Sequence, residues 1–127
     1  MDIIHRVPGY NHIYAYKSFS DEFCRLFKND KASLKRYQKW LTRRLGMLES
    51  KGTACINGQS FEYIDQDIYS IRLPESKHNP RVIFTFCLGE QNVILLTAFL
   101  EQNSSDYDSP KRISRNRIVM IREEFDL

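Results

Sequence analysis

The sequence predicts an α+β domain in which an N-terminal helical hairpin and a C-terminal helix pack on a small, mainly antiparallel sheet. Three observations lead to this fold class. Apolar residues recur at helical spacing within residues 31–52, strand-like runs follow one another over residues 61–100, and a proline marks the start of a last helical segment. A chain of 127 residues suffices for one domain, residues 1–127, with a single modest core.

The N-terminal part predicts a strand and two helices. Residues 12–17 alternate in side-chain character, which indicates a short strand. Ser20 is the expected N-cap of a short helix, because acidic residues follow it in the first turn. Asp30 is the expected N-cap of a second helix, which should end at Gly52. The apolar face of this second helix consists of Leu34, Tyr37, Leu41, Leu45 and Leu48.

The second half of the sequence changes to a strand period. Residues 61–64 form a strand or the approach to one, and three further runs rich in β-branched and aromatic residues follow at 68–73, 81–88 and 93–100. The pair Ser109-Pro110 predicts the start of the last helix, because proline is favoured at the first helical position. The predicted order is therefore β-α-α-β-β-β-α, with the strands forming a meander.

Composition indicates a folded cytoplasmic protein. The chain is 42% hydrophobic and 28% charged, so it resembles neither a disordered nor a membrane-embedded protein. No apolar run approaches the ~20 residues of a membrane-spanning helix, and the first ten residues lack the apolar centre of a signal peptide. The widely spaced cysteines fit no zinc or redox motif, which predicts reduced thiols at Cys24, Cys55 and Cys87.

Positive charge is concentrated in the second predicted helix. Its residues 31–52 contain seven Lys or Arg and a single glutamate, although the net charge of the whole chain is only +3. Lys35, Lys39 and Arg43 follow one another at a spacing of four residues and should form one stripe. Such a stripe is often only a solvated face, but this excess favours binding of RNA or of an acidic partner.

A second basic cluster surrounds the connection between the strands at 68–73 and 81–88. Arg72 and Arg81 stand at the two strand ends, with Lys77 and His78 between them. Strand residues of like parity project together, so both arginines are expected on the same open face, where they would bind an anion. An ordinary solvated turn is the alternative, with the arginines paired to acidic neighbours such as Glu62, Asp67 or Glu75.

Several motifs in this half of the chain resemble those of a known toxin family. They are YSIRLP at residues 69–74, PRVIFTF at 80–86, VILLTAF at 93–99 and DYDSPKRISRNR at 106–117. They are similar to strand and terminal-helix motifs of the RelE/ParE superfamily of bacterial type II toxins, including its HigB-like and phage-derived branches. The resemblance covers nearly the whole chain in element order, and specific motifs only in residues 69–117.

The resemblance implies a toxin that a cognate antitoxin protein holds in check. Many members of the family cleave mRNA on the ribosome without a metal or other cofactor, whereas the ParE branch acts on DNA gyrase. Arg72 and Arg81 match the strand cations of the ribonucleases, and Tyr107 lies where an acid/base or base-stacking residue is often found. His78 would serve as a base. Lys77 and the stripe of Lys35, Lys39 and Arg43 would then bind RNA.

The chain also departs from the family pattern. Glu101 and Gln102 follow the last strand, where many of these ribonucleases carry basic residues, and Pro80 replaces a usual tyrosine. Tyr107 could instead anchor the last helix, and His78 could simply be solvated. The alternatives are therefore a non-enzymatic toxin that binds a protein target such as gyrase, or a catalytically degenerate member that only binds its partner.

Overall fold

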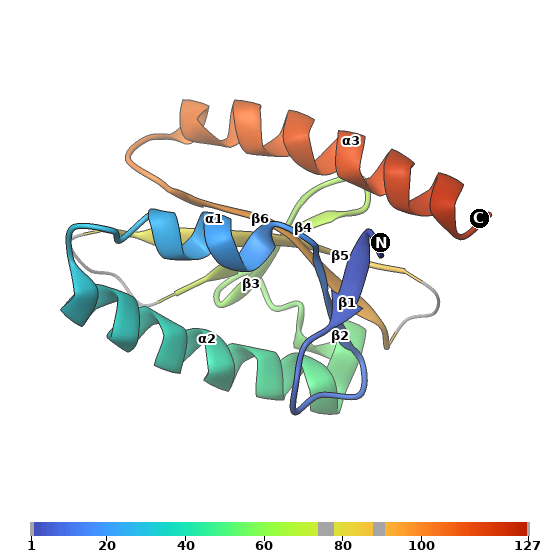
Figure 1. The fold of residues 1–127 in the computed structure, drawn as a ribbon, viewed down its shortest axis with the longest axis horizontal. Coiled ribbons are helices and arrows are strands. Elements are labelled where there is room, and N and C mark those ends of the chain that lie inside the picture. Colours follow the sequence, from blue (N-terminus) through green and yellow to red (C-terminus); the bar gives the residue numbers. More distant parts are fainter. Residues whose placement is uncertain (1, 74–77, 88–90, 127) are drawn as a thin grey trace.

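The computed structural model describes residues 2–73, 78–87 and 91–126, and it confirms the α+β class (Figure 1). The elements are β1 (Ile4–Arg6), β2 (Ile13–Tyr16), α1 (Phe19–Arg25), α2 (Lys31–Lys51), η1 (Gly52–Cys55), β3 (Phe61–Asp65), β4 (Ile68–Arg72), β5 (Pro80–Phe86), β6 (Val93–Leu100), η2 (Ser104–Tyr107) and α3 (Asp108–Glu124).

Within the described residues the sheet has six strands, in the order β1-β2-β6-β5-β4-β3. It is mainly antiparallel, as predicted, but β2 pairs with β6 in parallel. The strand β1 was not predicted. It has only three residues, too few for a visible alternation, and it forms because the following turn folds it back onto β2, with Ile4 opposite Tyr16.

The helices cover the two faces of the sheet. The hairpin of α1 and α2 lies on one face and α3 on the other (Figure 1). Buried aromatic and aliphatic residues of α1 and α2 pack on Val82, Phe84 and Leu95 of the sheet, whereas Ile121 of α3 packs on Ile83 on the opposite face. The side-chain alternation of β5 thus supplies both cores, which explains why nearly every residue of this strand is buried.

The helix ends correct two predictions and confirm two others. The N-cap of α1 is Ser18, not Ser20, and α3 begins at Asp108, so Pro110 lies inside its first turn rather than at its first position. The helix begins earlier than predicted because the 3-10 turn η2 runs directly into it. The predicted cap at Asp30 is confirmed, since its side chain accepts a hydrogen bond from the Ser33 amide at 3.1 Å. The predicted end of α2 at Gly52 is confirmed as well.

An ion pair joins the two helical layers where β2 ends. Arg117 of α3 donates to both carboxylate oxygens of Glu22 in α1, at 2.7 and 2.6 Å, and to the Leu96 carbonyl of β6 at 2.6 Å. Its guanidinium also lies 4.2 Å from the ring centre of Tyr16. The β2–β6 pairing reaches only as far as Leu95, so Arg117 satisfies the next carbonyl of β6, which has no partner from β2.

Candidate functional site

Four charged residues form a row across one end of the sheet. Arg72 of β4 lies directly opposite Arg81 of β5, so both side chains project from the same face, as predicted. Glu62 of β3 binds Arg72, and Glu101, just after β6, binds Arg81. The row Glu62–Arg72–Arg81–Glu101 thus places two cations side by side between two carboxylates, on the face that carries α3.

The guanidinium of Arg81 is not open to solvent. Its Nε donates to Oε1 of Glu101 at 2.8 Å, its Nη1 donates to the Pro80 carbonyl at 3.1 Å, and only 4% of the side chain is exposed. Arg72 therefore has the expected position on an open face, whereas Arg81 does not. A ligand reaches Arg81 only after Glu101, whose side chain is 22% exposed, has moved aside.

Arg72 is the accessible member of the pair. Its side chain is 40% exposed, and its Nη1 lies 3.2 Å from Oε2 of the half-exposed Glu62. Exposed ion pairs of this kind contribute little to stability and exchange readily with solvent ions. The backbone carbonyl of Arg72 accepts a hydrogen bond from Nε of Arg44 at 3.4 Å, which connects the end of β4 to α2.

Tyr107 lies at the Glu101 end of the row. Its ring packs edge-on against Phe99 at 4.8 Å between ring centres, so the predicted anchor role is part of its environment. Burial raises the pKa of Tyr107, and the nearby carboxylate of Glu101 acts in the same direction, while Arg81 opposes it. The phenol therefore stays protonated at neutral pH and can donate a proton or hydrogen bond, but it cannot serve as a base there.

His78 lies on the other side of the sheet, away from the two arginines. Its Nε2 is 2.9 Å from Oδ2 of Asp30, and its ring meets Phe27 and Tyr37 edge-on at 5.3 and 6.1 Å. These aromatic residues belong to the core beneath α1 and α2. The structure thus brings Arg72, Arg81 and Tyr107 together but not His78, and Lys77 lies outside the described residues.

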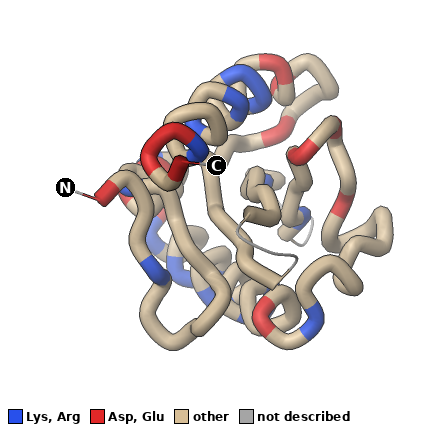
Figure 2. The backbone as a smooth tube through the Cα atoms, turned by 90° about the vertical axis from the view of Figure 1, so that its right-hand side faces the viewer, with Lys and Arg blue, Asp and Glu red and all other residues tan. Residues whose placement is uncertain are grey.

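The predicted basic stripe is exposed on α2. Lys35, Lys39 and Arg43 are all solvent-exposed, and within the described ranges no carboxylate lies at ion-pair distance from them. By contrast α3 carries both signs of charge (Figure 2), and its Arg115 and Arg122 pair with Asp65 and Asp67. These three cations of α2 are thus unpaired among the described residues, which suits an anionic macromolecule.

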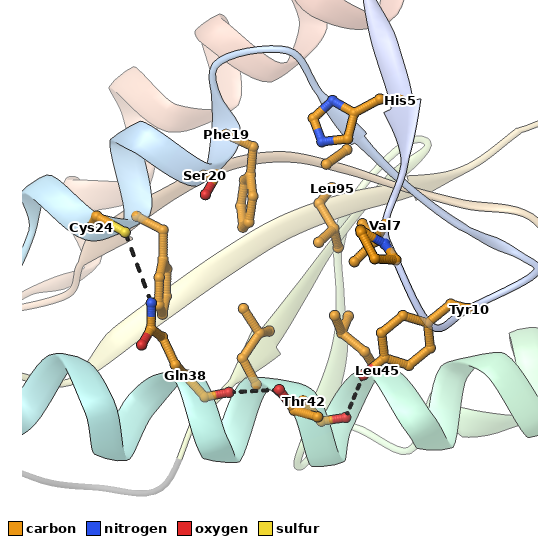
Figure 3. A pocket seen from close by; sticks show the side chains of 14 residues that line it. His5, Val7, Tyr10, Phe19, Ser20, Cys24, Gln38, Thr42, Leu45 and Leu95 are labelled. Atoms are coloured by element: carbon orange, nitrogen blue, oxygen red, sulfur yellow. Dashed lines mark hydrogen bonds between the residues drawn. The ribbon is translucent and has the colours of Figure 1, made fainter.

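A groove that the sequence did not predict lies between α1, α2 and the β1–β2 hairpin (Figure 3). Its volume is about 450 Å³. We call it the α1–α2 groove; its lining residues include Val7, Phe19, Phe23, Leu41, Leu45 and Leu95. The apolar spacing of α2 indicated a buried face, and Leu41 and Leu45 are buried as expected, but it did not indicate a groove beside the hairpin of β1 and β2.

Comparison of the chain with family models, with curated proteins and with solved structures gave no match. The resemblance to RelE/ParE toxins stays a prediction. In the described part of the chain no helix is both long enough and apolar enough to cross a membrane. Residues 2–73, 78–87 and 91–126 also contain no group of three or more His, Cys, Asp or Glu side chains placed to hold a metal ion.

Proposed function

We propose that the protein is the toxin of a RelE/ParE-like toxin–antitoxin pair and that it acts on mRNA as a metal-independent endoribonuclease. The observation that carries this proposal is the placement of Arg72 directly opposite Arg81. Like charges directly opposite one another destabilise a sheet. Two adjacent guanidiniums are, however, the arrangement that binds a phosphate and offsets the charge that develops on it during in-line attack.

The reacting phosphate would bind at Arg72, the accessible cation of the row. It would displace the exposed Glu62 carboxylate, and the second guanidinium would become available when Glu101 turns toward solvent. Glu101 would then be the base in reach of a ribose 2′-hydroxyl, and the protonated Tyr107 the group able to donate to the leaving oxygen. His78 takes no part in this scheme, because it contacts Asp30 and Phe27 on the opposite face of the sheet.

The basic stripe of α2 supports binding of the RNA backbone. Lys35, Lys39 and Arg43 follow one another at about 6 Å along the helix axis, because four residues rise about 1.5 Å each. The N-terminal end of α2 and the Arg72–Arg81 pair lie at the same end of the molecule, since His78, only three residues before Arg81, contacts the N-cap Asp30. One strand that bends round this end could contact both.

A non-enzymatic toxin is the second candidate. It is favoured by the burial of Arg81 against Glu101 and by the packing of His78 on the far face, which leave the charge row without an open pair of cations. In this case the α2 surface would bind a protein target or the ribosome, and the charge row would be a structural device that holds β3 to β6 together.

The test expresses the chain without a partner and follows growth together with mRNA cleavage. Wild type should arrest growth and cleave ribosome-bound mRNA. Arg72→Ala should reduce the cleavage rate by about two to three decades, because it removes a cation from the transition-state anion. Arg115→Ala is the matched control, since Arg115 of α3 belongs to an ion pair of similar exposure with Asp65, at the other end of β3 from Arg72.

The outcomes separate the two candidates. Growth arrest without cleavage would support the non-enzymatic toxin, and Arg72→Ala should then leave the arrest unchanged. Equal loss of activity in Arg72→Ala and Arg115→Ala would show that charge alone, and not position in the row, matters. A wild type that neither arrests growth nor cleaves RNA would contradict the toxin proposal itself.

A further inference from the structure

The strand β1 forms an open edge of the sheet. Within the described residues it pairs with β2 alone, so no strand lies on its outer side. The Lys17 amide donates to the Ile3 carbonyl at 2.9 Å, which makes Ile3 a residue that bonds toward β2. Residues that bond to the neighbour alternate along an antiparallel strand with residues that do not. The backbone N–H and C=O groups of Ile4 and Arg6 therefore point outward, away from β2.

The side chains along this edge carry opposite charges in a fixed order. Asp2, Ile4 and Arg6 line one hollow of about 440 Å³ beside β1. Asp2 and Arg6 are exposed, and neither has an ion-pair partner among the described residues. The edge thus presents an acid, an apolar residue and a base at intervals of two residues. This sequence of charges is complementary to itself when it is read in the opposite direction.

One register of two such edges uses this complementarity. Two copies related by a two-fold axis pair in antiparallel fashion, and their outward-pointing residues must face each other. Of the symmetric registers, only the one centred on Ile4 places Asp2 opposite Arg6 of the second copy, at both ends. A register centred on His5 places Asp2 opposite Pro8, which has no N–H to donate. A register centred on Arg6 places like charges opposite each other, which destabilises a sheet.

Phe125 overhangs the same edge from the end of α3. Residues 118, 121 and 125 lie within about 40° of one another around the helix, because each residue turns it by about 100°. Ile118 and Ile121 pack in the core on this face of the sheet, whereas Phe125 is 42% exposed and lines the hollow beside β1 (Figure 1). The core-facing stripe of α3 thus continues past the last strand. A strand added beside β1 would extend the sheet toward this ring.

We propose that the β1 edge is a homodimer interface in which residues 2–6 of two copies pair antiparallel, with Asp2 of each opposite Arg6 of the other. The two sheets then form one continuous sheet with both α3 helices on the same face and Phe125 near the two-fold axis. The charge row belongs to β3–β6, away from this edge, so the dimer leaves Arg72 uncovered. The proposal does not depend on whether the protein cleaves RNA.

The first test measures self-association of the full chain. The paired segment is short, so we expect a dissociation constant of about 10–100 µM, measured by sedimentation equilibrium up to about 1 mM protein. Amide hydrogen exchange followed by NMR locates the contact. The Ile4 and Arg6 amides should exchange more slowly as the dimer fraction rises. The His5 amide should change less, because it already points toward β2.

Charge variants test the register. Arg6→Asp places two carboxylates opposite each other and should weaken the dimer at least tenfold, and Asp2→Arg should do the same with two guanidiniums. An equimolar mixture of these two variants should associate like wild type, because every acid then faces a base. The double variant Asp2→Arg with Arg6→Asp should also recover dimerisation. Arg112→Asp, at an exposed position near the start of α3, changes the net charge as Arg6→Asp does and should weaken the dimer less than about threefold.

A second pair of variants tests the contribution of α3. Phe125→Ala should weaken the dimer at least threefold, because the ring loses apolar surface that the second copy covers. Val119→Ala is the matched control. Val119 is 54% exposed on the same helix but about 120° away from Phe125 around its axis, and its loss should leave the dimer unchanged. Circular dichroism and thermal midpoints like those of wild type show that each variant is folded.

Four results would overturn the proposal. A monomer at every concentration up to about 1 mM would exclude the interface. Equal weakening by Arg6→Asp and Arg112→Asp would show that net charge alone governs association. Failure of both the mixture and the double variant to recover the dimer would show that Asp2 and Arg6 are not opposite each other. A dimer in which the Ile4 and Arg6 amides exchange as in the monomer would place the contact elsewhere on the molecule.

Discussion

Arg81 and Glu101 form an ion pair at the end of the sheet, with 2.8 Å between Nε and Oε1 and 4% of the arginine side chain exposed. The glutamate lies between the buried guanidinium and solvent. It therefore has two effects at once. It compensates a charge that would otherwise be buried alone, and it occupies the position that an external anion would need in order to reach that charge.

Glu101→Ala is expected to destabilise the protein by about 3–5 kcal/mol, because it leaves a buried guanidinium without its partner. Glu62→Ala is the matched control, since it breaks the exposed half of the same row and should cost less than about 1 kcal/mol. Urea unfolding followed by circular dichroism measures both free energies. Similar small costs for the two variants would mean that Arg81 is solvated in solution and is available to ligands.

The Glu22–Arg117 pair predicts a loss of stability in acid. Partial burial acts to raise the pKa of Glu22, but hydrogen bonds from Arg117 and Ser18 outweigh it, so the pKa lies below its ordinary value of 4.5. A lowered pKa in the folded state stabilises the protein above the ordinary value, and this contribution is lost as the pH falls through the folded pKa. Unfolding free energies should therefore decrease from about pH 5 downward.

Glu22→Gln should flatten this acid dependence, since the amide does not titrate. The measurement is the urea midpoint of wild type and variant at neutral pH and at several lower values. Glu124→Gln, at the exposed end of α3, controls for the loss of one negative charge and should keep the slope of wild type. A wild-type slope retained in Glu22→Gln would assign the acid sensitivity to other carboxylates.

His78→Ala is expected to reduce stability and to leave the activity of the folded protein unchanged. The variant loses a contact of 2.9 Å with the Asp30 carboxylate and two edge-on ring contacts. The loss of a hydrogen bond to a charged group typically costs about 1.5–3 kcal/mol. Unfolding curves and RNA cleavage at a temperature where the variant is folded test this. Abolished cleavage together with unchanged stability would restore His78 to the reaction site.

The sequence predicted those parts of the fold that depend on local patterns. The apolar spacing of α2, its Asp30 cap and its Gly52 end are encoded within a few residues, and all three are confirmed. The projection of Arg72 and Arg81 from one face of the sheet also followed from side-chain alternation on adjacent strands. In each case the information lies in one helix or in one hairpin.

Features that depend on distant contacts were not visible in the sequence. The three residues of β1 become a strand only because β2 is beside them, and Glu101 meets Arg81 only because β5 and β6 are adjacent. The aromatic core that His78 contacts comes from α1 and α2, which no pattern around residue 78 could indicate. The α1–α2 groove needs three separate elements at once, so no single segment carries a signal for it.

The basic stripe of α2 makes the salt dependence of RNA binding a quantitative test. For single-stranded nucleic acid, the logarithm of the binding constant falls with the logarithm of salt concentration, with a slope of about −0.7 for each phosphate contact. Replacement of Lys35, Lys39 and Arg43 by glutamine should therefore reduce the magnitude of the slope by about 2 if each contacts one phosphate. Exposed helical positions tolerate this change, so the fold should be retained.

Titrations of a labelled single-stranded RNA at several salt concentrations give the slope for wild type and for the triple variant. Replacement of Lys111, Arg112 and Arg115 of α3 by glutamine is the control. It removes the same charge from the helix on the other face of the sheet, where acidic neighbours such as Asp65 compensate it. If the two triple variants lower the slope equally, RNA is attracted by net charge, and α2 is not its binding surface. A reduced slope for the α2 variant alone would place the RNA backbone on the stripe, because counterion release reports contacts and not mere attraction.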